Sequence, residues 1–196
     1  MEDLKDTTYD KEKKHTVEEW LALPEGKHVE LIDGVFYDKE YDMAPPSMLH
    51  QEIVGEIYYE IKNHIREKGG DCRVLTAPFG VRLHEEDENF VEPDITVVCD
   101  RDKLTEQGCV GAPDWVIEVI SPSTASMDYV KKRKLYMDAG VREYWIIDAG
   151  NRVIMVYTSS QPTCNESYTF EDTVKVGIYE DFSIDFKALS GRMLKL

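Results

Sequence analysis

The chain has 196 residues with 39 acidic and 23 basic side chains, which gives a formal net charge of −16. This length predicts a single domain, and a hydrophobic content of 42% excludes wholesale disorder and collagen-like repeats. No apolar run approaches the roughly 18 residues of a spanning helix, so we expect no membrane segment. The acidity disfavours phosphate contacts over most of the surface but leaves room for a locally basic cleft.

The four cysteines are scattered and form no CxxC pair; they are Cys72, Cys99, Cys109 and Cys164. The chain opens with charged residues rather than with a signal peptide. We therefore expect a cytoplasmic protein whose thiols are reduced and mostly fill the core.

The first third of the sequence predicts an arm, two helices and a hairpin. Residues 1–15 carry charges of both signs and little to bury, which predicts a flexible arm before a domain at 16–196. Thr16 begins a capping box for a short helix, and the segment 28–37 predicts two strands that turn at Asp33-Gly34. A long helix is predicted over 47–67, capped by Ser47 and ended by Gly69-Gly70. Its apolar face recurs every four residues, at Leu49, Ile53, Ile57, Ile61 and Ile65.

The remainder predicts mostly strands. They are expected at 72–76, 79–83, 94–99 and 115–120, and a helix follows over about 126–139 with Gly140 as its end. Segments 144–147 and 153–157 predict a hairpin whose apolar residues suit either a dimer surface or the core, and strand-like segments follow at 167–170 and 183–186. This order predicts one α/β domain with a mixed sheet and helices against its faces.

Two carboxylates lie on strands that are otherwise apolar. In the run 115–120 both faces are apolar except at Glu118, and a carboxylate in a covered strand must be paired, hydrogen-bonded or bound to a cation. An open end of the sheet or a buried arginine partner would also explain it. Asp94 follows Pro93 at the start of another strand, where a turn or cap role is also compatible. Together they could supply hard oxygen ligands for Mg²⁺ or Mn²⁺.

One lysine of the second helix is directed at this sheet. At about 100° per residue, Lys132 lies near the centre of the apolar sector, whereas Lys131 and Lys134 point away. The alternative is a lysine whose stem packs while its amine reaches solvent. Because methionine keeps most of the packing of the stem, we expect Lys132→Met to cost about 1 kcal/mol or less.

Two residues of the first half are each compatible with more than one role. Glu30 interrupts an apolar strand of the hairpin, where one face is often wet. His50 lies in the first turn of the long helix, a place where a histidine is more often a surface or capping residue than a ligand.

Ordered motifs run along the chain from about residue 16 to 196. They are Glu30-Leu31-Ile32-Asp33-Gly34, Pro45-Pro46-Ser47 with His50, Pro93-Asp94, Pro113-Asp114 with Glu118-Val119, Ser121-Pro122-Ser123-Thr124, then Asp128, Lys132 and Tyr136, and Gly140-Val141-Arg142-Glu143-Tyr144-Trp145 followed by Asp148. This series resembles the Uma-type restriction-endonuclease-like family of the PD-(D/E)XK nuclease superfamily. The resemblance implies a restriction-endonuclease-like mixed β-sheet flanked by helices.

The resemblance also implies a site. Asp94 would be the motif aspartate and Glu118 the motif acid, and with the Val119 carbonyl they would hold Mg²⁺ or Mn²⁺. The superfamily's lysine normally follows the acid by two residues, where this sequence has Ile120. Lys132 would then supply the amine from the next helix, with Glu30 and His50 as further catalytic members.

The function implied is a metal-dependent DNA endonuclease that hydrolyses phosphodiester bonds. Cutting both strands of a duplex is simplest with two sites, so we expect a homodimer. The alternative is a catalytically silent nuclease-fold module that acts by binding, which Ile120 and the net charge of −16 would favour. Hydrolysis of another phosphoester in the same site is also compatible with the sequence.

Overall fold

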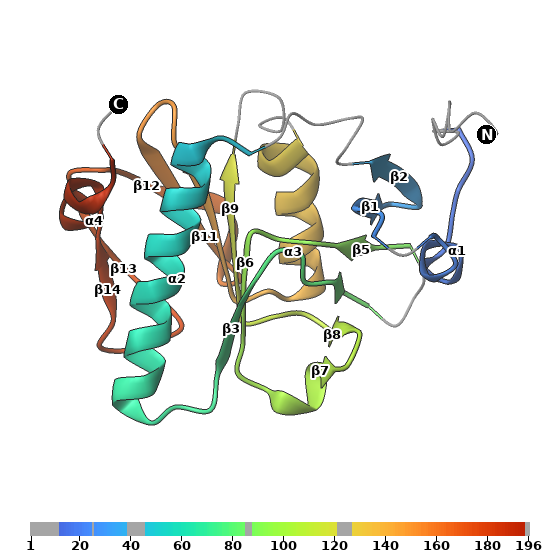
Figure 1. Cartoon of the computed structure of the whole chain (residues 1–196), viewed down its shortest axis with the longest axis horizontal. Helices are drawn as coiled ribbons and strands as arrows, with labels where there is room; N and C mark the ends of the chain where they lie inside the picture. The colour runs from blue at the N-terminus through green and yellow to red at the C-terminus, as the bar shows by residue number, and fades with distance from the viewer. Residues whose placement is uncertain (1–11, 25, 39–45, 85–87, 121–126, 195–196) are drawn as a thin grey trace.

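The computed structural model describes residues 12–24, 26–38, 46–84, 88–120 and 127–194, without the side chains of 162–165 (Figure 1). The helical elements are α1 (Val17–Leu21), α2 (Met48–Lys68), the 3-10 turn η1 (Arg101–Lys103), the π-helical turn η2 (Met127–Lys132), α3 (Arg133–Ala139) and α4 (Phe186–Arg192). Among these residues, no helix has the length and apolar character that crossing a membrane requires.

The central sheet is mixed, with strand order β12-β11-β10-β9-β6-β3. Its strands are β3 (Arg73–Thr76), β6 (Ile95–Val98), β9 (Trp115–Ile120), β10 (Glu143–Asp148), β11 (Val153–Thr158) and β12 (Gln161–Thr169). The pair β9–β10 is parallel and the other pairs are antiparallel. The prediction of an α/β fold with a mixed sheet is confirmed.

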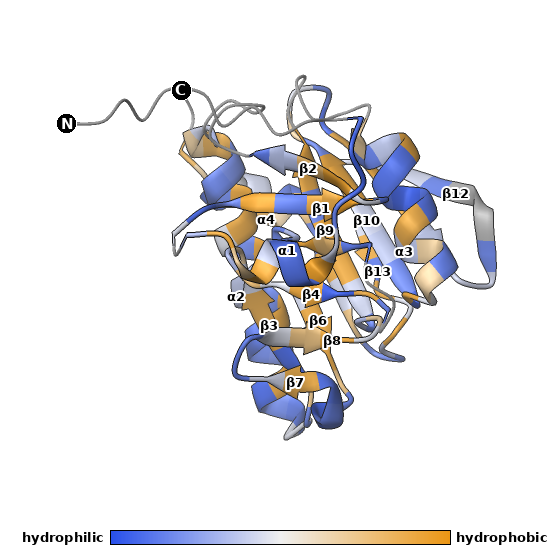
Figure 2. Ribbon diagram, turned by 90° about the vertical axis from the view of Figure 1, so that its right-hand side faces the viewer, coloured by the Kyte–Doolittle hydropathy of each residue, from blue (hydrophilic) through white to orange (hydrophobic). Residues whose placement is uncertain are grey.

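The two faces of β9 contact different helices, as the alternation in its sequence predicts. Trp115, Ile117 and Val119 pack in the cluster that contains the buried face of α2. Val116 and Ile120 pack in the cluster that contains residues of α3. Figure 2 shows the hydrophobic colour on β6 and β9, between helices that carry hydrophilic residues. Glu118 therefore lies on the α3 side of the sheet.

Helix α2 has the limits that its sequence predicts. The Ser47 side chain accepts a hydrogen bond from the backbone N–H of His50 at 3.1 Å, which caps the N-terminus. Gly69 ends the helix in the left-handed conformation with φ 62°, a geometry that favours glycine. The cap also fixes the backbone at His50 against the start of the helix.

A second six-stranded sheet, which the sequence did not predict as a separate unit, has the order β2-β1-β5-β4-β8-β7. It consists of β1 (Val29–Ile32), β2 (Val35–Asp38), β4 (Val81–Arg82), β5 (Phe90–Val91), β7 (Leu104–Thr105) and β8 (Gly108–Val110). The predicted hairpin at 28–37 forms β1 and β2. The other strands are two or three residues long, too short for a pattern of alternation.

Several expectations need correction. The predicted helix over 126–139 is a π-helical turn followed by α3, and the strand-like segment 183–186 is β14 (Ser183–Asp185), paired with β13 (Thr173–Lys175) and followed directly by α4. The hairpin at 144–157 lies inside the central sheet, and most of its apolar residues, including the fully buried Tyr144, belong to the core, whereas Val153 and Met155 are only partly buried.

The expectation of reduced thiols is wrong for one pair. Cys72 and Cys99 form a disulfide between the start of β3 and the end of β6. Cys109 is a free, buried thiol as expected, and burial raises its pKa to about 11. The side chain of Cys164 lies outside the described part of the chain.

Other expectations concern segments that the structure does not describe. They are most of the predicted arm at 1–15, the motif Ser121-Pro122-Ser123-Thr124, and Pro45. The end of the arm is described: His15 donates its backbone N–H to the Gly34 carbonyl at 2.7 Å and stacks on Phe36.

Candidate functional site

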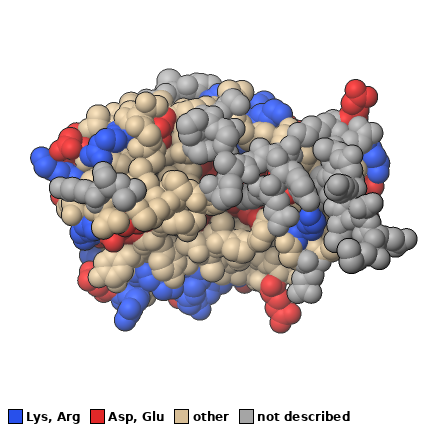
Figure 3. Space-filling model, turned by 45° about the horizontal axis from the view of Figure 1, so that its top comes forward, with Lys and Arg blue, Asp and Glu red and all other residues tan. Residues whose placement is uncertain are grey.

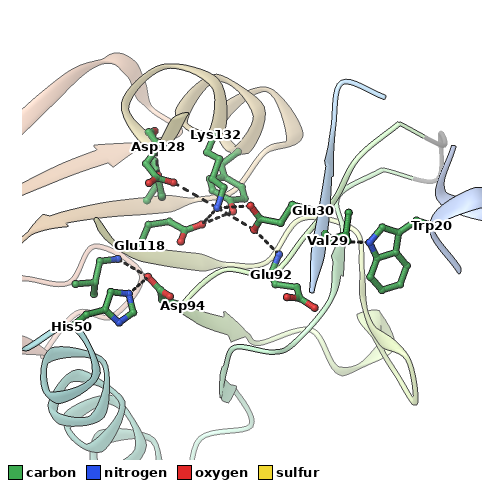
Figure 4. Close-up of polar contacts among 12 residues, drawn as sticks. Trp20, Val29, Glu30, His50, Glu92, Asp94, Glu118, Asp128 and Lys132 are labelled. Carbon is green, nitrogen blue, oxygen red and sulfur yellow. Dashed lines mark hydrogen bonds and ion pairs between the residues drawn. The ribbon is translucent and has the colours of Figure 1, made fainter. Parts of the chain in front are cut away.

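A buried lysine lies at the centre of a cluster of carboxylates (Figure 4). The ammonium of Lys132 is 2.9 Å from Oε1 of Glu118 and 3.0 Å from the carboxylate of Glu30. It is 3.5 Å from Oδ1 of Asp128, one helical turn earlier. Only 4% of Lys132 is exposed, so the inward direction predicted from helical periodicity is confirmed and the amine does not reach solvent.

The neighbouring lysines point outward, also as predicted. Lys131 is exposed and donates to the Tyr37 hydroxyl at 2.7 Å. Lys134 is exposed and forms an ion pair with Asp138 on the next turn of α3. These two residues are therefore matched controls for Lys132.

The carboxylates of the cluster come from three separate elements. Glu118 is on β9, Asp128 is on the π-helical turn η2, and Glu30 is on β1 of the second sheet. Glu30 has no exposed surface and accepts the backbone N–H of Glu92 at 3.0 Å, so a wet-face interpretation of its strand is wrong. The cluster thus joins the two sheets to the helix that carries Lys132.

A tyrosine hydroxyl also binds Glu118. Tyr136, one turn after Lys132 and fully buried, donates to Oε1 of Glu118 at 3.0 Å. The same oxygen therefore accepts from both Lys132 and Tyr136. From the part of the chain that the structure describes, no hydrogen bond reaches the other oxygen, Oε2.

The electrostatics of the cluster follow from burial and from its excess of carboxylates. Burial raises the pKa of Glu118 to about 8; Lys132 opposes this rise, and Asp128, Asp94 and Glu30 add to it. Burial lowers the pKa of Lys132, but the attraction of Glu118, Glu30 and Asp128 outweighs it and leaves that pKa well above its usual value. The amine is therefore a cation at neutral pH.

Asp94 lies next to this cluster, where β6 begins. Its Oδ2 accepts the backbone N–H of Val119 at 2.8 Å and lies 3.1 Å from Nε2 of His50. The N–H and C=O of one residue in an extended strand point to the same neighbour, so the Val119 carbonyl also faces the Asp94 side. β6 pairs with β9, so the prediction that Asp94 leads into a strand next to that of Glu118 is confirmed.

The structure brings all the sequence-predicted site residues to one region, in two hydrogen-bonded groups. Glu30, Glu118 and Lys132 form the first group, and His50 and Asp94 form the second with the backbone of Val119. Ile120 is 4% exposed and packs in the apolar cluster with α3, so its position supplies no cation. Among the described residues, no group of three or more His, Cys, Asp and Glu side chains is arranged so that it could hold a metal ion.

Two residues of the cluster were not predicted as site residues. Asp128 and Tyr136 lie four residues before and after Lys132, and both contact the cluster. The available signal was this spacing, because residues one turn apart share a helix face. The sequence alone did not indicate that the face meets Glu30.

Three comparisons relate the chain to known proteins. A family model described as "Uma2: Putative restriction endonuclease" matches residues 17–187. The chain is 29% identical over 141 residues to "Uncharacterized protein slr1290" of Synechocystis sp. (strain ATCC 27184 / PCC 6803 / Kazusa), and the match covers 71% of this chain and 70% of that protein.

A solved structure shares the fold. It is described as "Crystal structure of a putative nuclease belonging to DUF820 from Anabaena variabilis ATCC 29413". The TM-score is 0.73 at 24% sequence identity, over 90% of this chain and 97% of that chain. The similarity confirms the fold class expected from the sequence.

Proposed function

The chain belongs to the Uma2 family of restriction-endonuclease-like proteins, and on this premise we propose that it is a metal-dependent DNA endonuclease that hydrolyses phosphodiester bonds. The observation that carries the proposal is the buried ammonium of Lys132, held 2.9 Å from Glu118 beside the strand position that Asp94 contacts. An inward cation between acids is suited to stabilising the negative charge that develops on a phosphoryl group.

The donor set fits a small divalent cation. Asp94 and Glu118 provide hard carboxylate oxygens, and each keeps one oxygen that accepts no hydrogen bond from a described residue. The Val119 carbonyl is the third oxygen that would hold the cation. Mg²⁺ and Mn²⁺ commonly retain waters, so few protein ligands suffice. When bound, such an ion lowers the pKa of a bound water and neutralises charge on the phosphate.

The side chains of the chain have distinct tasks in this proposal. Lys132 stays protonated, so it orients the attacking water and stabilises the charged phosphoryl oxygens rather than removing a proton. Glu30 and Asp128 hold the ammonium in place. His50 and the Val119 N–H hold Oδ2 of Asp94, which leaves Oδ1 as the oxygen that would bind the cation.

Plasmid nicking tests the proposal. The wild type is expected to convert supercoiled plasmid to nicked circles with Mn²⁺ or Mg²⁺ and to stop when EDTA is added. Asp94→Asn and Glu118→Gln, which keep the side-chain shape, are expected to lower the rate about 10²-fold or more. Glu143→Gln is the matched control, because Glu143 is also a buried carboxylate of the central sheet but contacts Trp145 and Ile178 instead of the cluster.

The test has outcomes that reject the proposal. If Asp94→Asn and Glu118→Gln cut as fast as Glu143→Gln, the assignment of these carboxylates fails. A wild type that binds Mn²⁺ in a calorimetric titration but cuts neither single- nor double-stranded DNA would instead support a catalytically silent binding module. The buried Ile120 at the superfamily's usual lysine position is the observation that favours this second candidate.

A further inference from the structure

Glu118 is held by two donors that converge on a single carboxylate oxygen. Lys132 donates to Oε1 at 2.9 Å and Tyr136 donates to the same atom at 3.0 Å. We propose that Tyr136 is a positioning residue whose hydroxyl fixes the Glu118 carboxylate so that Oε2 faces the divalent cation. The inference rests on the proposed metal site at Asp94 and Glu118.

The two donors differ in how many partners they have. Lys132 also contacts Glu30 and Asp128, so its ammonium is shared among three carboxylates. A phenolic hydroxyl can donate only one hydrogen bond, and Tyr136 donates it to Glu118. When the ammonium shifts toward a phosphoryl group or water, the tyrosine is therefore the contact that keeps Glu118 in its orientation.

Packing of the side chain does not explain why residue 136 carries a hydroxyl group. The ring is fully buried between α3 and the central sheet and packs against the ring of Tyr144 with centroids 4.9 Å apart. Phenylalanine would fill the same space without a polar atom, and a buried hydroxyl is costly unless it is hydrogen-bonded. The partner it reaches is the proposed metal ligand, which identifies the orientation of that ligand as its task.

The fold supplies the alignment. Tyr136 follows Lys132 by one turn, so the π-helical turn and α3 present both donors on one face. That face packs against the side of β9 that carries Glu118. Donors from one helix thus approach one oxygen of a carboxylate on the adjacent strand.

Titration of MnCl₂ into the purified chain by isothermal calorimetry tests this inference. Tyr136→Phe removes only the hydroxyl, and we expect the dissociation constant for Mn²⁺ to rise about 10-fold or more, the range for loss of a residue that orients a metal ligand. Tyr144→Phe is the matched control. It removes the hydroxyl of the adjacent, equally buried tyrosine, which donates to the Asp128 backbone carbonyl at 3.3 Å and not to Glu118.

Melting temperatures separate positioning from general loosening. Both variants are expected to lose a similar few °C in Tm, while only Tyr136→Phe loses affinity for Mn²⁺. The inference is overturned if Tyr136→Phe binds Mn²⁺ as tightly as the wild type, if both variants weaken binding equally, or if the wild type itself shows no saturable binding. A wild type that binds Mn²⁺ tightly, weakens on Tyr136→Phe and cuts no DNA would support the positioning role while rejecting the proposed nuclease activity.

Discussion

The contacts of Lys132 change what its replacement should cost. From the sequence, Lys132→Met was expected to cost about 1 kcal/mol or less because methionine keeps the packing of the stem. The structure shows that the ammonium lies within 3.5 Å of three buried acidic side chains, Glu30, Glu118 and Asp128. If the ammonium is removed, the negative charge of its partners stays buried. Water cannot reach that charge to compensate it, which is strongly destabilising.

We therefore predict that Lys132→Met lowers the free energy of unfolding at neutral pH by several kcal/mol, on the order of 3–5. Urea denaturation followed by circular dichroism measures this. Lys131→Met and Lys134→Met remove exposed charges from the same helical segment and should change stability by about 0.5 kcal/mol or less. Equal stability of all three variants would contradict the role of the ammonium in the cluster.

A buried carboxylate outside the cluster, Glu143, makes stability depend on pH. Glu143 is 1% exposed and accepts the Trp145 indole N–H at 2.6 Å and the Ile178 N–H at 2.9 Å. Burial raises its pKa above 4.5 despite these hydrogen bonds. The folded state thus holds the proton more strongly than the unfolded state. The stability that this contributes is complete below pH 4.5 and is lost as the pH rises through the folded-state pKa.

We predict that the wild type loses stability relative to Glu143→Gln as the pH is raised above about 4.5, by at most about 1.4 kcal/mol per pH unit. Denaturation curves of both proteins at a series of pH values from 4 to 7 give the difference directly. Other groups titrate in both proteins and cancel. A difference that stays constant over this range, or that grows in favour of the wild type, would show that the pKa of Glu143 is not raised.

At the scale of elements, the N-terminus of α2 links helix formation to the site. Ser47 caps the helix by accepting the His50 N–H, and the imidazole of the same His50 contacts Asp94. A change in the cap therefore reaches the second group of the site through one residue.

We predict that Ser47→Ala lowers the free energy of unfolding by about 1 kcal/mol, the usual effect of losing an N-cap. It should also weaken Mn²⁺ binding modestly, because His50 is held less firmly. Ser159→Ala, at an exposed serine that follows β11, serves as the control and should lie within about 0.5 kcal/mol of the wild type. The prediction fails if both variants have the same denaturation midpoint.

The segment 127–139 shows why a helix of changing pitch suits this site. Asp128 and Lys132 lie on the π-helical turn, and Tyr136 lies on the regular helix α3. All three are buried against the sheet. Single π-turns in helices are frequent at functional sites. Here the π-helical turn directs the side chains of Asp128 and Lys132 toward the sheet.

At the scale of the whole molecule, the candidate site lies where the two sheets and α3 meet. Lys132 joins β1 of one sheet to β9 of the other through Glu30 and Glu118. The net charge of −16 does not make the surface uniformly acidic: on the face in Figure 3, basic side chains gather at the lower left and acidic ones are interspersed. We therefore expect DNA to bind only where basic side chains gather, and its affinity to fall as salt is added.

We predict a homodimer, because cleavage of both strands of a duplex is simplest with two sites. Light scattering over a concentration series is expected to give twice the 22.6 kDa mass of one chain. Most apolar side chains of the hairpin of β10 and β11 are buried in the core, which disfavours this hairpin as the contact surface. A mass of one chain at every concentration, with single-strand nicking as the only product, would contradict the prediction.

The sequence by itself determined the features that depend on neighbours along the chain. Apolar residues at every fourth position with Ser47 and Gly69 at the ends specified α2. Alternation specified the two faces of β9 and the isolated position of Glu118. Helical periodicity specified that Lys132 points inward. In each case the period of the helix or strand fixes which side chains share a face. The buried face can therefore be predicted from the sequence before the tertiary structure is known.

Only the tertiary structure decided which buried faces meet. Glu30 contacts Lys132 across 102 positions of the chain. It also contacts Glu92 across 62 positions, and Cys72 bonds to Cys99 across 27. The strand predicted at 79–83 is shortened to β4, whereas β5, β7 and β8 were not predicted, because two or three residues carry too little pattern to specify a strand. Local periodicity states that a side chain is buried, whereas its partner is fixed only when separate elements pack together.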